Sequence, residues 1–154
     1  MSGAAERLAA LGLTLPPVAT PVAAYVPAMR TGAYVYTSGQ LPTVDGKLPA
    51  VGKVGDEVSA QDAAGMARTC ALNALAAAAS AAGGLEAIRR IVKVTGFVAS
   101  APGFGSQAQV INGASELLIE VLGEDGKHAR SAIGVAELPL NAPVEVELIA
   151  EVRD

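Results

Sequence analysis

One arginine and a set of glutamates near the end of the chain combine a group that can bind a carboxylate with groups that can position water. Arg130 precedes a segment without charged residues. Glu145, Glu147 and Glu151 follow in a segment without lysine. A guanidinium can hold a carboxylate through two parallel hydrogen bonds, and a carboxylate can orient a water molecule. The same residue types are also typical of a solvated strand face with a surface arginine, so both interpretations stay open at this point.

Two strands must position these groups. Residues 144–152 alternate between apolar side chains and mostly acidic ones, which is the period of a strand with one buried face. The apolar positions are Val144, Val146, Leu148, Ala150 and Val152. The three glutamates therefore share the opposite face. Arg130 lies in the preceding segment, residues 129–139, which we predict to be a strand followed by a turn at residues 141–143.

Periodicity and turn residues define the remaining elements. We predict a short helix over residues 4–11, a hairpin with strands at 22–26 and 33–38, a loop over 41–55, a helix over 59–82, a strand over 88–99 and a helix over 106–122. The order of the main elements is ββαβαββ, which indicates an α+β fold with helices packed on a sheet. We expect one domain over residues 1–154, with a short helical extension at about residues 4–12.

Local signals mark the ends of the longest helix. Ser59 and Asp62 form a capping-box-like pair at its start, and Gly83 is typical of a left-handed cap at its end. Cys70 lies in the middle of this helix and is expected to be a core residue without chemistry. Gly96 is expected to mark a bulge in the following strand.

Composition excludes several classes of protein. The formal net charge of −4 and the lack of a basic patch with interleaved aromatic residues argue against nucleic-acid binding. One cysteine and one histidine are too few for a disulfide or a zinc site, so we expect no metal and a reducing compartment, the cytoplasm. No signal peptide is expected, and the longest uncharged run, residues 69–85, is shorter than the ~20 residues of a membrane span.

Short motifs in a particular order support a resemblance to a known family. The motifs are Tyr25, Thr37-Ser38-Gly39-Gln40-Leu41-Pro42, Asn112, Arg130-Ser131, Leu138-Pro139 and Glu145-Val146-Glu147. Each motif alone is common, but the ordered set spans residues 22–152 and resembles the RidA/YjgF family of reactive intermediate deaminases, also labelled endoribonuclease L-PSP-like. The resemblance implies a chorismate-mutase-like mixed β-sheet with two main helices packed on one face, and a homotrimer with sites between subunits.

The resemblance also implies an activity. Family members hydrolyse enamines and imines such as 2-aminoacrylate to a 2-keto acid and ammonia, without a metal or organic cofactor. Arg130 would bind the carboxylate of the small-molecule substrate, and Glu145 would position the water. Tyr25 would form a wall of the site and shuttle a proton. Ser38 and Gly39 would contact polar atoms of the substrate, and Asn112 would support the loop near Arg130.

Two departures from the family pattern indicate a divergent branch. Ala132 occupies the position where many members carry a cysteine, and Ala24-Tyr25-Val26-Pro27 replaces the usual Gly-Pro-Tyr-Ser. A thiol-dependent role is therefore in doubt, and the substrate can differ from 2-aminoacrylate. One alternative is a regulatory trimer that binds keto acids or amino acids without turnover. An endoribonuclease is disfavoured, because the chain is acidic and His128 is its single histidine.

Overall fold

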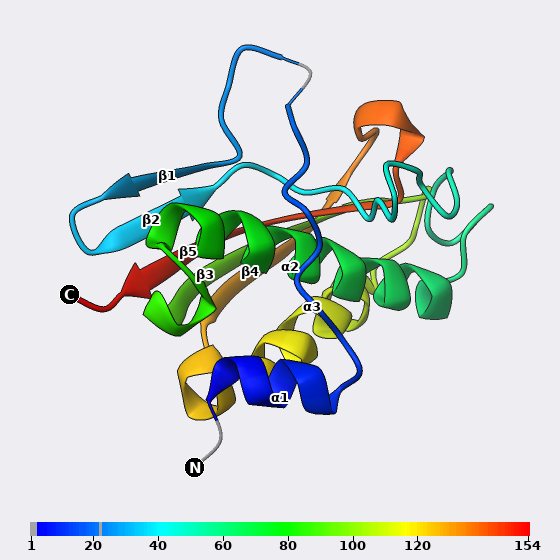
Figure 1. Ribbon diagram of the computed structural model, residues 1–154. Coiled ribbons are helices and arrows are strands. Elements are labelled where there is room, and N and C mark those ends of the chain that lie inside the picture. Colours follow the sequence, from blue (N-terminus) through cyan, green and yellow to red (C-terminus); the bar gives the residue numbers. More distant parts are fainter. Residues whose placement is uncertain (1–2, 22) are drawn as a thin grey trace.

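A mixed sheet covered on one face by two helices forms the body of the molecule (Figure 1). The computed structural model describes residues 3–21 and 23–154. Within these residues the sheet has five strands in the order β1-β2-β5-β3-β4, and only β3 and β4 are parallel neighbours. The elements are α1 (Ala4–Ala10), β1 (Ala28–Thr31), β2 (Tyr34–Thr37), α2 (Ala60–Ala82), η1 (Leu85–Ala87), β3 (Ile88–Ala99), α3 (Gln107–Leu122), η2 (Gly123–Gly126), β4 (Ala129–Val135), η3 (Pro139–Asn141) and β5 (Val144–Val152). The predicted α+β class, with two main helices on one face, is confirmed.

The two ends of α2 form as their residues predict. The Ser59 hydroxyl oxygen accepts a hydrogen bond from the backbone N–H of Asp62 at 3.1 Å. Gly83 ends the helix in the left-handed region, with φ of 98°. Cys70 lies in the helix interior and is fully buried, as expected of a core residue. No described helix is long and apolar enough to cross a membrane.

Small residues let α2 and α3 approach each other closely. A Cβ atom at Gly113 would overlap the backbone carbonyl oxygen of Ala64. Similarly, Gly96 leaves room for the side chain of Ile111, which packs over β3. The prediction of a bulge at Gly96 is wrong, because the pairing of β3 with β4 and β5 runs through Gly96 without a shift in register. The register shifts of β3 lie nearer its start, between Ile88 and Lys93.

Replacing Gly113 with alanine is expected to destabilise the protein by about 1–3 kcal/mol, because the new methyl group overpacks the contact between two backbones. Gly65→Ala on α2 is the matched control, since no atom from outside its own helix lies within 4 Å of the place that its methyl group would take. That change should be neutral or stabilise the helix by up to about 1 kcal/mol. Urea denaturation of both variants measures the difference. Equal free energies of unfolding would contradict this packing.

The first hairpin begins later than predicted. Residues 23–25 form a bend, and the first strand, β1, starts at Ala28 after Pro27. Proline has no N–H group to donate to a neighbouring strand, so pairing cannot extend beyond Pro27 through its nitrogen. The carbonyl oxygen of Pro27 accepts the last hydrogen bond of the hairpin, from Ser38 N at 2.8 Å. The predicted strand over 22–26 is therefore wrong, and Val22 lies outside the described residues. The turn itself is centred on Gly32 and Ala33, at the end of the predicted connection.

The two faces of the sheet differ sharply in character. The alternate residues of β5 that begin with Val144 are buried under the helices, as predicted. The opposite face carries large apolar side chains that are 43–58% exposed: Met29, Tyr34, Tyr36 and Ile133. Strand pairing places Met29, Tyr36 and Ile149 side by side on this open face. An apolar surface of this kind is typical of a contact with another polypeptide.

Candidate functional site

Arg130 lies on the edge strand β4, and its guanidinium is held against α3. Its Nη1 atom donates to Asn112 Oδ1 at 2.8 Å and to Ser115 Oγ at 3.2 Å. Its Nη2 atom donates to the backbone carbonyl oxygen of Ala108 at 3.3 Å. These bonds use three of the five N–H groups of a guanidinium. Within the described ranges, Nε–H and one Nη2 hydrogen have no acceptor, so they are available to a ligand.

The helix spacing explains how three acceptors meet one side chain. Positions 108, 112 and 115 are four and three residues apart, so they lie along one side of α3. Arg130 pairs with Val94 of β3, whose side chain is buried under the helices, and it therefore points to the same side of the sheet. All three acceptors are neutral, and in the part of the chain that the structure describes Arg130 makes no ion pair. The positive charge of Arg130 is oriented without being neutralised.

Ser115 and His128 extend this network away from Arg130. The Ser115 hydroxyl lies 2.9 Å from Nε2 of His128, and Nδ1 of His128 lies 2.6 Å from the carbonyl oxygen of Gly126. Burial lowers the pKa of His128, the contact with Gly126 raises it, and the charge of Arg130 lowers it. Our sequence interpretation gave neither residue a place in the site. The available signal was that Ser115 shares the polar side of the helix with Asn112.

Glu145 lies at the start of β5, on the open face of the sheet. It occupies space that a side chain at position 39 would fill, because a Cβ atom at Gly39 would overlap the Glu145 carboxylate. Partial burial, and next the charge of Glu147, raise the pKa of Glu145. The carboxylate is therefore a better proton acceptor than an ordinary surface glutamate. Gly39 and Glu145 therefore form one local arrangement.

Tyr25 and Ser38 lie beside Gly39. The Ser38 hydroxyl donates to the carbonyl oxygen of Val26 at 2.6 Å and so holds the segment that carries Tyr25. A cavity of about 130 Å³ is lined by both Tyr25 and Gly39. Tyr25 is 53% exposed, so its ring can form the wall of a cleft that another surface completes. The Ser38 hydroxyl proton is already donated, which leaves its oxygen to accept from a ligand.

One chain does not bring Arg130 and Glu145 together. Arg130 pairs with Val94 and Glu145 with Phe97, on the two sides of the intervening strand β3. Positions three apart on a strand face opposite sides, and partners in a ladder share a face. Arg130 with Asn112 therefore lies on the helix side, whereas Glu145 with Gly39 lies on the open face. Their backbones are also about 10 Å apart along the strands and about 10 Å apart across them.

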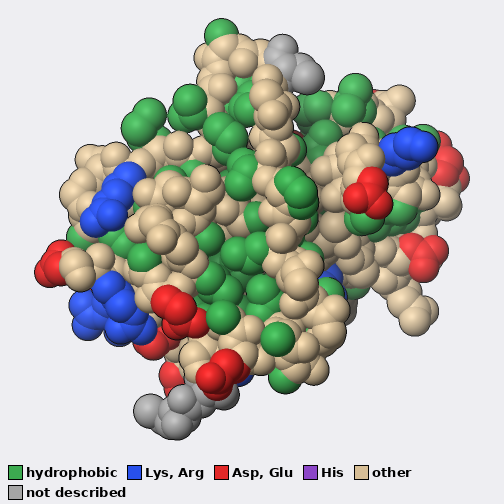
Figure 2. All heavy atoms as spheres, viewed as in Figure 1, with side chains coloured by type: hydrophobic (Ala, Val, Ile, Leu, Met, Phe, Trp, Pro, Cys, Tyr) green, Lys and Arg blue, Asp and Glu red, His purple; other side chains and the backbone are tan. Residues whose placement is uncertain are grey.

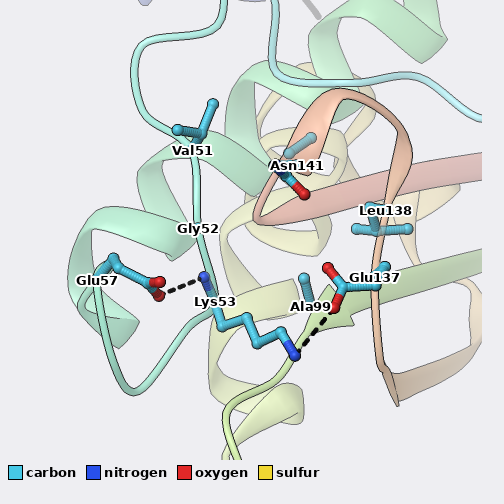
Figure 3. Close-up of a pocket in the computed structure, with 9 residues that line it drawn as sticks. Val51, Gly52, Lys53, Glu57, Ala99, Glu137, Leu138 and Asn141 are labelled. Carbon is cyan, nitrogen blue, oxygen red and sulfur yellow. Dashed lines mark hydrogen bonds and ion pairs between the residues drawn. The ribbon is translucent and has the colours of Figure 1, made fainter.

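A separate cavity that the sequence interpretation missed lies between the loop before α2 and the connection before β5 (Figure 3). Its volume is about 250 Å³. Two of its lining residues, Lys53 and Glu137, form an ion pair with Lys53 Nζ 3.1 Å from the carboxylate, and Lys53 N donates to Glu57 Oε2 at 2.9 Å. The latter bond lowers the pKa of Glu57. Gly52 N donates to the carbonyl oxygen of Asn141 at 2.9 Å, which joins the two segments. None of the predicted site residues lines this cavity.

The potential metal ligands are dispersed. Over residues 3–21 and 23–154, no group of three or more His, Cys, Asp or Glu side chains is arranged to hold a metal ion. Cys70 is buried, and burial raises the pKa of its thiol well above the ordinary value. Ala132 pairs with Gly96 of β3, lies on the same side of β4 as Arg130 and packs against the core. The site around Arg130 therefore offers hydrogen-bond donors and no thiol.

A family model and several proteins match nearly the whole chain. The model described as "YjgF/chorismate_mutase-like, putative endoribonuclease" matches residues 5–152. Protein TCP17 of Trypanosoma cruzi is 40% identical over 151 residues, which cover 97% of this chain and 94% of that protein. The mitochondrial protein MMF1 of Saccharomyces cerevisiae is 32% identical over 142 residues, covering 89% and 84%.

Solved structures show the same arrangement of elements. Atu1372 from Agrobacterium tumefaciens is 48% identical, with a TM-score of 0.89, and the match covers 97% of this chain and 92% of that one. E. coli TdcF with bound serine is 29% identical, with a TM-score of 0.64, covering 89% and 94%. The second of these similar chains was thus solved with an amino acid bound.

Proposed function

The chain belongs to the YjgF/chorismate mutase-like family, which confirms its resemblance to RidA/YjgF proteins, and from this premise we propose that it is an enamine and imine deaminase. The proposed reaction converts intermediates of the 2-aminoacrylate type to 2-keto acids and ammonia. One observation carries this proposal. Arg130 keeps an uncompensated charge and an unused pair of N–H groups, which suit the carboxylate that every such substrate carries.

Arg130 acts in binding and orientation. Its Nε–H and remaining Nη2–H bind the two carboxylate oxygens of the substrate, which places the neighbouring imine carbon at a set distance from the guanidinium. Asn112 holds Nη1, so the guanidinium cannot rotate away. The enamine first takes a proton on its terminal carbon and becomes an imine. The imine carbon is then electrophilic, and a positioned water is sufficient for its hydrolysis.

Glu145 acts on that water. As the water oxygen bonds to the imine carbon, the carboxylate accepts a proton from the water and the imine nitrogen gains a proton, which gives a carbinolamine. The carbinolamine hydroxyl then loses its proton and the nitrogen takes one up, so that breakage of the carbon–nitrogen bond releases ammonia and leaves the carbonyl group of the keto acid. Burial, and next the charge of Glu147, raise the pKa of Glu145, so its carboxylate accepts a proton more readily than an ordinary surface glutamate does. Tyr25 forms the wall of this space and passes protons, and Ser38 and Gly39 contact the substrate.

The proposed site is shared between subunits. Within one chain, Arg130 and Glu145 face opposite sides of the sheet. One substrate can therefore contact both groups only if one subunit supplies Arg130 and a second subunit supplies Glu145. The exposed apolar side chains of the open face give a surface on which copies can pack. We propose a homotrimer, as the family implies. Light scattering at micromolar concentration is expected to give the mass of three chains, and a monomer would contradict the shared site.

Asn112 gives a prediction that separates charge from hydrogen bonding. Asn112→Ala removes one hydrogen bond to Arg130 and is expected to weaken keto-acid binding by about 3- to 10-fold. Asn112→Asp keeps an acceptor for that bond but neutralises Arg130, so binding should fall by at least about another 10-fold. Titration calorimetry with pyruvate measures both. An aspartate variant that binds pyruvate as well as the asparagine protein would show that the charge of Arg130 does not act in binding.

A second function, binding without turnover, is supported by two observations. TdcF was solved with serine bound, which is an amino-acid carboxylate rather than a product of imine hydrolysis. Ala132 also lacks the thiol that many family members carry at this position. In this alternative the same arginine holds a keto acid or an amino acid, and the trimer transmits the bound state. Keto-acid release from an imine distinguishes the two functions, since only the deaminase accelerates it.

Nucleic-acid cleavage, the older family label, has less support. In the view of Figure 2, charged side chains gather toward the edges, and hydrophobic and uncharged groups fill the centre. The net charge is −4, and the one histidine, His128, is hydrogen bonded to Ser115 and next to Gly126. A ribonuclease needs a cationic surface and a free acid–base pair. We therefore propose small-molecule chemistry with no cofactor, and no nucleic-acid partner.

The proposed compartment is the cytoplasm. Cys70, the single cysteine, is buried and cannot form an intrachain disulfide, which suits a reducing environment. The similar yeast protein MMF1 is named as mitochondrial, and a mitochondrion is therefore the alternative location. Cell fractionation of the organism of origin would separate the two.

A further inference from the structure

The hydrogen bonds that link Arg130 to Ser115, His128 and Gly126 have a donor-to-acceptor direction that follows from the chemistry of the atoms. Nδ1 of His128 lies 2.6 Å from the carbonyl oxygen of Gly126, and a carbonyl oxygen can only accept. Nδ1 therefore carries a proton, and Nε2 of the neutral ring is an acceptor. The Ser115 hydroxyl, 2.9 Å from Nε2, must donate to it. This leaves the lone pairs of Ser115 Oγ to accept from Arg130 Nη1 at 3.2 Å.

The last group in this series of hydrogen bonds, the carbonyl of Gly126, is positioned by backbone packing. Gly126 is buried, and a Cβ atom there would overlap the carbonyl oxygen of Leu118 on α3. The backbone of η2 is therefore pressed against α3, and the Gly126 carbonyl oxygen has a set position. Arg130, Ser115, His128 and Gly126 form a chain in which each group donates to the next.

We propose that Ser115 and neutral His128 are positioning residues for Arg130, which together set the orientation in which its guanidinium binds a carboxylate. This inference rests on the proposed role of Arg130 in carboxylate binding. It does not depend on whether the bound molecule is then hydrolysed. Neither residue touches the ligand, and both act through Nη1 of Arg130.

A second proton on His128 would break the series. Nε2–H would become a donor, so that Arg130 and His128 would both donate to Ser115 Oγ and the hydroxyl proton would turn away. Two cations would then stand on either side of one hydroxyl. Burial and then Arg130 lower the pKa of His128 and outweigh the contact with Gly126, which raises it, so the neutral ring is favoured at pH 7.

Other charged groups near His128 are engaged elsewhere or point away. The charged side chains on the elements around it are Glu116 and Glu120 of α3, Glu124 and Asp125 of η2, Lys127 and Arg130. Glu120, Asp125 and Lys127 pair with Arg68, Arg90 and Glu124. Glu116 lines the groove beside Arg68. Of the charged groups in the described chain, Arg130 is the one that shifts the pKa of His128.

Four variants test the proposal through pyruvate binding at pH 7.5. Ser115→Ala removes the acceptor for Arg130, and His128→Leu removes the acceptor for Ser115, so each should weaken binding by about 3- to 10-fold. The double variant should lose no more than about 2-fold beyond either one, because both changes break the same series. His128→Gln places a neutral amide oxygen near the position of Nε2, and its affinity should match that of the wild type.

The pH dependence gives a readout that general damage to the fold would not reproduce. As the pH is lowered from 7.5 until the ¹⁵N resonances of His128 show that its ring has taken up the second proton, the affinity of the wild type for pyruvate should fall relative to that of His128→Gln, because only the wild type gains this proton. A ratio that stays constant overturns the proposal. So does a Ser115→Ala protein that binds pyruvate like the wild type, or losses that add in the double variant.

A ligand-free measurement keeps this test separate from the proposed function. The Arg130 Nε–H resonance in ¹⁵N spectra of the protein without pyruvate should shift or broaden in Ser115→Ala and His128→Leu, and should stay unchanged in His128→Gln. If the wild type does not bind pyruvate, the proposed function fails, and these spectra still decide whether the pair orients Arg130. An Arg130 resonance that is the same in all four proteins would overturn the proposal.

Discussion

Replacing Arg130 with alanine is expected to weaken pyruvate binding by about 30- to 1,000-fold, as measured by titration calorimetry. Losing a desolvated bidentate contact with a carboxylate costs about 2–4 kcal/mol. The acceptors that surround Arg130, which are Asn112, Ser115 and the Ala108 carbonyl, orient the guanidinium but are neutral. They cannot replace its charge once the side chain is gone.

Two further arginine variants make this result specific. Arg130→Lys keeps the charge but cannot bond to all three acceptors and a carboxylate at once, so it should recover only part of the affinity. Arg30→Ala is the control for net charge, since Arg30 is exposed and its Nε bonds to Gly32 in the hairpin turn. That variant should bind pyruvate normally. Unchanged affinity in Arg130→Ala would remove Arg130 from the site.

Glu145→Gln is expected to slow imine hydrolysis by about 10²- to 10⁴-fold, while pyruvate affinity stays within about 3-fold of the wild type. Glu145 acts on the attacking water and not on the substrate carboxylate, so its loss affects the transition state more than binding. In the wild type the rate should also fall at acid pH, as the carboxylate, whose pKa is raised, takes up a proton. An equal loss of rate and of affinity would instead place Glu145 in ligand binding.

The same variant has an expected effect on stability. Burial, and next Glu147, raise the pKa of Glu145, so the folded protein holds this proton to higher pH than the unfolded chain does. The contribution of Glu145 to stability is therefore present below its unfolded pKa and is lost as pH rises through the folded value. Glu145→Gln should raise the Tm at pH 7.5, and the difference should shrink toward pH 4. A lower Tm at pH 7.5 would show that the ionised carboxylate stabilises the fold.

Much of the architecture could be predicted because local rules and burial agree. Ser59 and Gly83 mark the ends of α2, and the alternation of β5 correctly separates its buried face from its glutamates. The strand over 88–99 was predicted at its observed bounds. In each case a short stretch of sequence contains the whole signal. The range of the first strand was predicted wrongly, because Pro27 determines where pairing begins and this depends on the partner strand.

The site could be predicted only as separate pieces. The resemblance led us to expect Asn112 near Arg130, and the two side chains are hydrogen bonded, although the role of Asn112 stays a prediction. Ser115 and His128 were missed because their contact depends on how α3 packs over β4. In β4 both sets of alternate residues contain small and apolar types, so the sequence does not indicate which side Arg130 faces. The separation of Arg130 from Glu145 within one chain therefore appears only in three dimensions.

The most direct test of an imine deaminase with sites shared between subunits is complementation between two inactive variants. A dehydratase generates 2-aminoacrylate or 2-iminobutyrate in the assay, and keto-acid formation is followed with wild type, Arg130→Ala, Glu145→Gln and trimers reassembled from equal amounts of the two variants. The wild type should accelerate release, and each variant alone should be nearly inactive. Averaged over all trimers of a random 1:1 mixture, about one cleft in four joins an intact Arg130 to an intact Glu145 from a neighbour, so about a quarter of the wild-type rate should return. An active wild type without recovery in the mixture would contradict a shared site, and a wild type that binds pyruvate yet never accelerates release would contradict the deaminase.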